Sequence, residues 1–207
     1  MGNSGGSSGL GSSGGAIGHS RPTTDKHFAQ SEMTDDEKLA WIMNVTGASE
    51  AEAKEMLDAV REYLNGDDNT FKDIHSGKNK KVEALINKFL NNKNVPIFAG
   101  ETFRGVYIRS QNGRSAESIV QDILNTGRWQ EPGISSFSSD RSVAMDFALG
   151  SGRGASVILR KPVNRTGVPV AHLSEYFDEY EVLHPAGTYK ITGWRRNGNM
   201  YYVDISE

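Results

Sequence analysis

Cysteine is absent from this 207-residue chain, which excludes disulfide frameworks, thiolate metal sites and cysteine nucleophiles. Long apolar runs are absent too, and none approaches the ~20 residues that a membrane-spanning helix needs. The N-terminus also lacks the apolar segment of a secretory signal. We therefore expect a soluble, monomeric protein that does not insert into a membrane.

The chain also lacks a clear set of metal ligands and a net positive charge. The five histidines show no ligand spacing, so we predict no bound metal. The net charge of -3 gives no reason to expect general nucleic-acid binding. The basic pair Arg195-Arg196 is either a solvated face or a partner contact. Hydrophobic residues make up 36% and charged residues 24% of the chain, which is within the range of globular domains.

The composition divides the chain into a tail and one domain. Residues 1–30 are rich in Gly and Ser and then polar, so we predict a disordered tail or linker there. An expression linker, an inter-domain linker and a secretion segment all fit this composition. Residues 31–207 are predicted to form the folded domain, mainly helical over 31–95 and mainly β over 96–207.

Capping signals mark the helical part. Thr34 with Glu37, and Ser49 with Glu52, each have the spacing of a capping box. Apolar residues after Ser49 repeat at helical spacing; they are Ala53, Met56, Leu57, Val60, Tyr63 and Leu64. Residues 65–68 are predicted to end this helix, and a further helix is predicted over 80–90.

Strand-like runs dominate after Pro96. We predict strands at 102–109, 134–137, 156–160, 168–172, 180–184, 188–192 and 200–205, with helices near 115–124 and around 143–147. Helices first and strands later favour an α+β domain with a mainly antiparallel sheet.

Three short segments carry candidate chemistry, and each also has a plain structural explanation. Residues 103–106 read Phe-Arg-Gly-Val, which also fits an edge-strand Arg beside a bulge. Residues 135–139 read Ser-Ser-Phe-Ser-Ser, which also fits a strand end followed by a helix cap. Glu179 and Glu181 would share one face of a strand, with Tyr180 opposite. The Glu-x-Glu pattern alone decides nothing, because residues 50–52 repeat it at a helix start.

The order of these segments resembles the R-S-E class of mono-ADP-ribosyltransferases. That family, which includes bacterial toxins, secreted effectors and phage proteins, has an aromatic-Arg-Gly strand, then Ser-Thr-Ser, then Glu-x-Glu or Gln-x-Glu. This chain has the corresponding residues at 103–105, 136–138 and 179–181. The resemblance covers roughly residues 55–207, and the run 181–189 is also similar. One departure is Phe137, which stands where the family usually has Thr.

The resemblance implies a split antiparallel sheet that holds NAD as co-substrate in a cleft. Arg104 would pair with the NAD phosphates, and Gly105 would let the backbone approach the nicotinamide amide. Glu181 would be the catalytic carboxylate that stabilises an oxocarbenium-like state. Ser136 would orient Glu181 by a hydrogen bond.

The resemblance also implies the acceptor. Glu179 matches the residue that receives a guanidinium in arginine-modifying members of the family. Tyr176 matches a substrate-contacting aromatic residue, and Phe177 is the alternative. We therefore expect transfer of ADP-ribose to an arginine of a target protein, with release of nicotinamide. The site of action would be cytosolic, including the cytosol of a host cell.

Two other functions remain as alternatives. An NAD glycohydrolase would pass ribose to water, but it has no use for a guanidinium receptor such as Glu179. A non-enzymatic binding module on the same fold is disfavoured by the presence of Arg104, Ser136 and Glu181 together.

Overall fold

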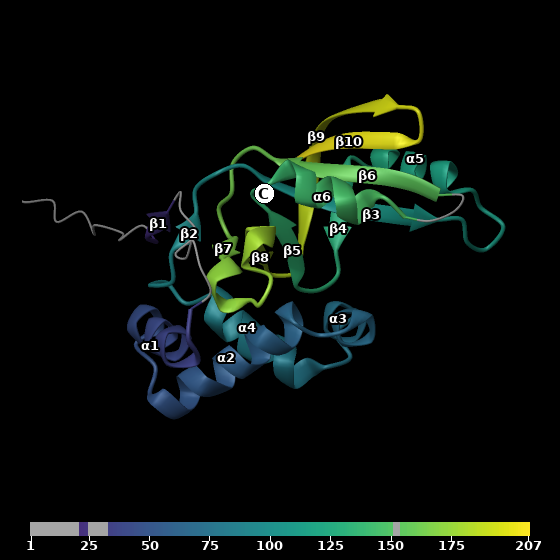
Figure 1. The fold of residues 1–207 in the computed structure, drawn as a ribbon. Coiled ribbons are helices and arrows are strands. Elements are labelled where there is room, and N and C mark those ends of the chain that lie inside the picture. The colour runs from purple at the N-terminus through teal and green to yellow at the C-terminus, as the bar shows by residue number, and fades with distance from the viewer. Residues whose placement is uncertain (1–20, 25–32, 151–153) are drawn as a thin grey trace, which may run out of the picture.

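The computed structural model describes residues 21–24, 33–150 and 154–207. Helices α1–α4 gather on one side of the molecule, below a twisted mixed sheet that the rest of the chain forms (Figure 1). The predicted α+β class, with a helical N-terminal part before a largely antiparallel sheet, is confirmed.

The helical part begins where the capping signals predict. Both capping boxes form, because the Thr34 and Ser49 side chains accept from the backbone N–H three residues on while Glu37 and Glu52 reach back. The helices are α1 (Asp35–Thr46), α2 (Glu50–Leu64), α3 (Asp68–His75) and α4 (Lys80–Leu90). Helix α3 was not predicted; Asp67, placed in a terminating turn, caps it by accepting from Asn69 and Thr70.

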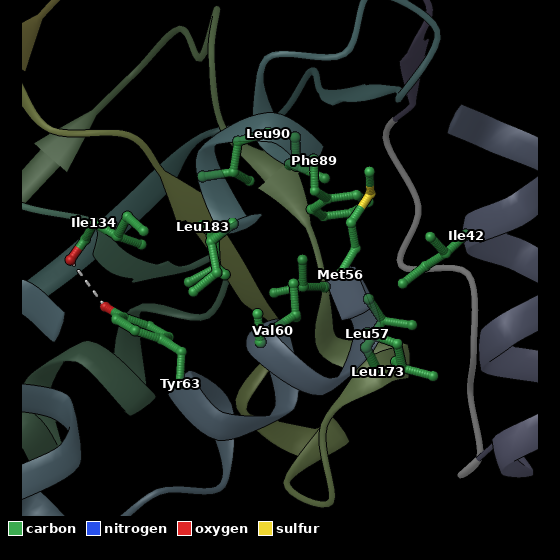
Figure 2. Packing of buried hydrophobic residues seen from close by; sticks show 14 of the residues in the cluster. Ile42, Met56, Leu57, Val60, Tyr63, Phe89, Leu90, Ile134, Leu173 and Leu183 are labelled. Atoms are coloured by element: carbon green, nitrogen blue, oxygen red, sulfur yellow. Dashed lines mark hydrogen bonds between the residues drawn. The ribbon is translucent and has the colours of Figure 1, made fainter. Parts of the chain in front are cut away.

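A shared core joins the helices to the sheet. Figure 2 shows Val60 of α2 in one cluster with Phe89 of α4 and Leu183. Tyr63 is buried and donates its hydroxyl to the Ile134 carbonyl oxygen at 3.1 Å. Burial of each of these side chains stabilises the fold by about 1.5–3 kcal/mol. The helical and strand-rich parts therefore pack as one unit.

The main sheet is antiparallel except where β6 lies parallel to β10. In spatial order its strands are β4 (Arg128–Glu131), β9 (Gly187–Asn197), β10 (Met200–Ser206), β6 (Gly154–Lys161), β3 (Thr102–Arg109), β5 (Ser135–Ser138), β8 (Glu181–His184) and β7 (Val168–Pro169). β3 and β5 meet at a single registered pair, Phe103 with Ser138. The sheet is therefore split at this point, as the resemblance implies. The predicted strand 168–172 is shorter than expected, because a 3-10 turn (Ala171–Leu173) replaces its second half.

Two helices cover opposite faces of the sheet (Figure 1). Alternating side chains of β6 point to opposite sides. Val157 packs on the side of α5 (Ala116–Thr126), whereas Ile158 packs on the side of α6 (Arg141–Ala148). Helix α6 lies against β3 beside the split, so its side chains can line a cavity at that place.

Residues 21–24 differ from the predicted tail. Strand β1 (Thr23–Thr24) pairs in parallel with β2 (Ile97–Phe98). Arg21 donates to the Leu90 carbonyl oxygen at 2.6 Å and to the Val95 carbonyl oxygen at 2.7 Å. These contacts satisfy acceptors at and just beyond the end of α4, and they give this short segment a fixed place. Most of the predicted tail, residues 1–20 and 25–30, lies outside the described residues.

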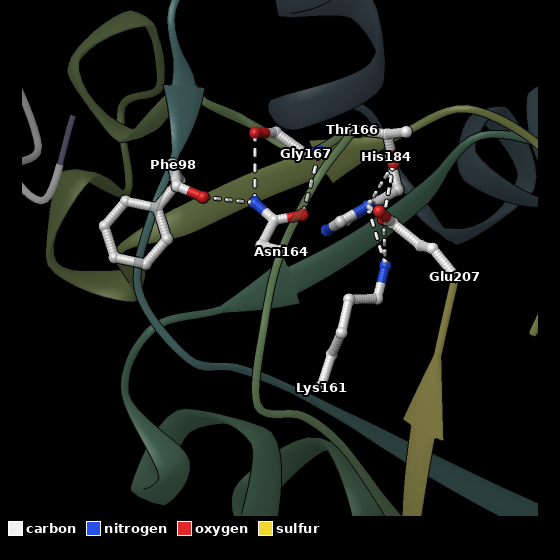
Figure 3. Close-up of polar contacts among 7 residues, drawn as sticks. All are labelled: Phe98, Lys161, Asn164, Thr166, Gly167, His184 and Glu207. Carbon is white, nitrogen blue, oxygen red and sulfur yellow. Dashed lines mark hydrogen bonds and ion pairs between the residues drawn. The ribbon is translucent and has the colours of Figure 1, made fainter. Parts of the chain in front are cut away.

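A buried lysine ties three parts of the sheet together (Figure 3). Lys161 of β6 lies 3.0 Å from His184 Nδ1 and 3.0 Å from Glu207 Oε1, and Thr166 donates to the same carboxylate at 2.7 Å. Burial lowers the pKa of Lys161 to about 8, although Glu207 opposes the shift. Burial and the Lys161 charge also hold the pKa of His184 well below its usual value, so His184 is neutral in the fold.

Candidate active site

A cavity of about 360 Å³ opens at the split in the sheet, between α2, β3, α6 and the start of β8. This volume is typical of small-molecule sites. All six residues that the sequence predicts for the site line it: Arg104, Gly105, Ser136, Tyr176, Glu179 and Glu181. The fold therefore brings together residues separated by as many as 77 positions along the chain.

Glu181 is the buried carboxylate of this cavity. It is the first residue of β8 and its exposed fraction is 6%. The pKa of Glu181 is raised to about 8, mainly by burial and also by the charge of the nearby Glu179. A hydrogen bond with the Ser136 side chain and the charge of Arg104 act in the opposite direction. The role of Ser136 in orienting Glu181 stays a prediction.

Glu179 reaches the same cavity by a different route from the one predicted. The prediction that both glutamates lie on one strand is wrong. Glu179 ends a short 3-10 helix (Phe177–Glu179), and Tyr180 then adopts φ 49°, in the left-handed region. The position of the Glu179 carboxyl group relative to that of Glu181 is therefore set by this turn, and not by the alternation of side chains along a strand. The backbone of the turn is held by Ser138, which donates to the Glu179 carbonyl oxygen at 2.7 Å.

Arg104 bridges the split from β3. Its Nη1 donates to the Ser136 carbonyl oxygen at 2.7 Å, and its Nε lies 3.2 Å from Glu131 Oε1. The contact with Glu131 is an ion pair rather than an aligned hydrogen bond. Because Arg presents several N–H donors in a planar fork, two protein contacts still leave donors for a ligand.

Glu131 is the member of this cluster that the sequence did not reveal. It lies on the edge strand β4 with an exposed fraction of 4%, and it accepts from Trp129 Nε1 at 2.8 Å. His75 Nε2 lies 3.8 Å away on its other side. The alternation of residues 128–131 places Trp129 and Glu131 on one inward face, a signal that a strand prediction there would have used.

Gly105 is required by packing as well as by any ligand. A Cβ at this position would overlap the carbonyl oxygen of Ala144 and crowd Ala148 N in α6. The absence of a side chain therefore lets α6 lie directly on β3. The approach of a nicotinamide amide to Gly105 stays a prediction.

The remaining aromatic residues of the site are Phe137, which is buried, and the exposed rings at the cavity mouth. Phe137, the departure from the family pattern, is buried and its ring centroid lies 4.6 Å from that of His184. At the cavity mouth, Tyr176 and Phe147 are 53% and 61% exposed. Tyr176 thus lines the cavity, and the alternative Phe177 is not among the lining residues.

The described residues contain no group of three His, Asp or Glu side chains placed to hold a metal ion. Within the same ranges, every helix is too short or too polar to cross a bilayer. The cavity instead offers a guanidinium, two carboxyl groups and aromatic rings. These groups suit a ligand with phosphates, a ribose and a flat cationic ring, which is the chemistry of NAD.

Comparisons with known proteins agree with this geometry. No family model matches the sequence. A putative NAD(+)–arginine ADP-ribosyltransferase, Vis of Vibrio splendidus, is 24% identical over 175 residues, which cover 80% of this chain and 67% of that protein. The crystal structure of Vis with an inhibitor has a TM-score of 0.53 at 22% identity and covers 85% of this chain and 86% of its own.

The C3 exoenzyme of Clostridium limosum has the same TM-score of 0.53, with 18% identity and coverage of 86% of this chain and 97% of its own. The ADP-ribosyltransferase HopU1 of Pseudomonas syringae also gives 0.53, with 12% identity and coverage of 81% and 87%. The resemblance to mono-ADP-ribosyltransferases and the predicted fold are thereby confirmed.

Proposed function

We propose that this protein is a mono-ADP-ribosyltransferase that transfers ADP-ribose from NAD to an arginine of a target protein. The observation that carries the proposal is the gathering of Arg104, Ser136, Glu179 and Glu181 around one cavity. The likeness to Vis, described as an arginine ADP-ribosyltransferase, supports the choice of acceptor.

In this mechanism Arg104 binds the phosphates of NAD through the donors that Glu131 and Ser136 leave free. The bond between nicotinamide and ribose breaks with its electron pair going to nicotinamide. The ribose then carries positive charge, which the Glu181 carboxylate stabilises at close range. The hydrogen bond from Ser136 keeps Glu181 directed into the cavity.

Glu181 must be ionised for this task. With its pKa raised to about 8, the carboxyl group is largely protonated at neutral pH in the free protein. A cationic nicotinamide ring beside it favours the ionised form. NAD binding and ionisation of Glu181 are therefore coupled, and transfer should increase with pH through this range.

Glu179 supplies the second carboxylate. It would hold the arginine guanidinium facing the ribose and accept the proton that the attacking nitrogen releases. Its own pKa is raised, first by burial and then by Asp178, which suits a group that takes up a proton. Tyr176, exposed at the mouth, would contact the acceptor beside it.

The test separates the two carboxylates. Glu179→Gln leaves Glu181, Arg104 and Ser136 in place, so NAD cleavage to free ADP-ribose should persist. Transfer to agmatine should be lost, because the amide gives a guanidinium no ionic partner. Nicotinamide release and agmatine labelling are measured on the same preparation. Equal loss of both activities, or unchanged labelling, would contradict the assignment of Glu179.

We infer the biological setting from the proteins to which this chain is similar. Vis is described as a toxin and the C. limosum protein as an exoenzyme. We therefore favour a toxin or effector that modifies a target protein in the cytosol of a host cell; a phage protein is the alternative setting.

A further inference from the structure

A second groove, of about 460 Å³, lies beside the catalytic cavity. It opens on the sheet face that α6 only partly covers, and β3, β6, β9 and β10 line it. Phe103 lines both hollows. Helix α6 also contributes to both, because Arg141 at its start faces the groove and Phe147 near its end faces the catalytic cavity.

The charges in this groove do not balance. Arg160 is neutralised by Glu101 at 2.5 Å and Asp204 at 3.4 Å. Arg141 and Arg195 instead lie over the ring of Tyr202, with their guanidinium carbons 5.3 and 4.1 Å from its centroid. Within the part of the chain that the structure describes, neither of these two arginines forms an ion pair.

The three arginines and two carboxylates that line the groove sum to a charge of +1, in a protein whose net charge is -3. Stacking on Tyr202 holds both guanidinium groups in place, which reduces the entropy lost when they bind a partner. Trp194 contributes to the groove from β9, but its ring lies 6.4 Å from that of Tyr201, on the α5 side of the sheet. Trp, Tyr and Arg are the residues enriched at the energetic centres of protein interfaces.

We propose that this groove docks an acidic segment of the arginine-bearing target protein. The proposal rests on the proposed transferase function. The target's arginine would occupy the catalytic cavity, and a second contact of the same target would lie on the other side of α6. Carboxylates on the target would pair with Arg141 and Arg195, while its arginine enters the cavity beside Glu179. Glu101 and Asp204 already pair with Arg160, so only Arg141 and Arg195 remain for a ligand, which suits the few carboxylates of a short peptide tract better than a continuous phosphate backbone.

The experiment uses synthetic acceptors and the full chain. Each peptide carries one arginine joined through Gly-Ser spacers of graded length to a Glu tract or to a Gln tract of equal length. We expect the Glu tract to raise kcat/KM roughly three- to tenfold at its best spacer length, and less at high salt. The variant Arg141→Gln/Arg195→Gln should lose this preference and keep wild-type kinetics with agmatine.

The matched control is Arg128→Gln/Arg165→Gln, which removes the same charge from two exposed arginines outside the groove. This control should keep the preference for the Glu tract. The proposal is wrong if the wild type shows no preference at any spacer length, or if the groove variant retains it. It is also wrong if poly(U) abolishes the preference more effectively than polyglutamate of equal charge. If the wild type transfers no ADP-ribose to agmatine, the transferase function itself is refuted.

Discussion

Removing the Glu181 charge should stabilise the fold at alkaline pH while it abolishes transfer. Burial raises the pKa of Glu181 from 4.5 to about 8. Between these values the native state keeps a proton that the unfolded chain has lost, so stability falls as pH rises through this window. At about 1.4 kcal/mol per pKa unit, the upper limit is roughly 5 kcal/mol. Ser136 and Arg104 remain to relax around the charge, so we expect ~2–4 kcal/mol.

Urea denaturation of the wild type and of Glu181→Gln at pH 5.5 and pH 9 measures this effect. At pH 5.5, only about one pH unit into this window, the variant should be the more stable protein by at most about 1.4 kcal/mol. At pH 9 this difference should be larger. Other groups that titrate in this range, such as Lys161, are common to both proteins and cancel. A stability difference that does not change with pH would refute the reasoning.

Two further predictions concern the cluster that holds Arg104. Arg104→Lys should raise KM for NAD about tenfold with a smaller effect on kcat, because Lys has no planar fork to contact Glu131, Ser136 and a phosphate together; full activity would show that only a charge is needed. Glu131→Gln should lower the free energy of unfolding by about 3 kcal/mol, because Arg104 would be left buried without its ionic partner; a denaturation curve matching that of the wild type would contradict the ion pair.

Local signals predicted the helical part well. Capping boxes at Thr34 and Ser49 and the apolar periodicity of α2 depend on neighbours within a few residues, so the sequence contains all that is needed. Helix α3 was missed because Asp67, which can end one helix, here begins the next. Turn residues favour both outcomes, and the packing of the following segment decides between them.

The site residues were predicted from the order of three short motifs, and their convergence on one cavity agrees with that order. Their geometry was predicted less well. The strand expected through Glu179 fails because Tyr180 takes a left-handed conformation, which is uncommon for a bulky residue and carries no sequence signal. Glu131 was missed because its role depends on Arg104, which lies 27 positions earlier and on a different strand.

The most direct test of the proposed function is the product of NAD and agmatine. The protein is incubated with both, and ADP-ribosyl-agmatine and nicotinamide are quantified by mass spectrometry, with Glu181→Gln as the matched control. We predict equal amounts of the two products from the wild type, and a loss of at least about 100-fold in the variant. Nicotinamide without ADP-ribosyl-agmatine, or neither product from a folded protein, would contradict the assignment as an arginine-directed transferase.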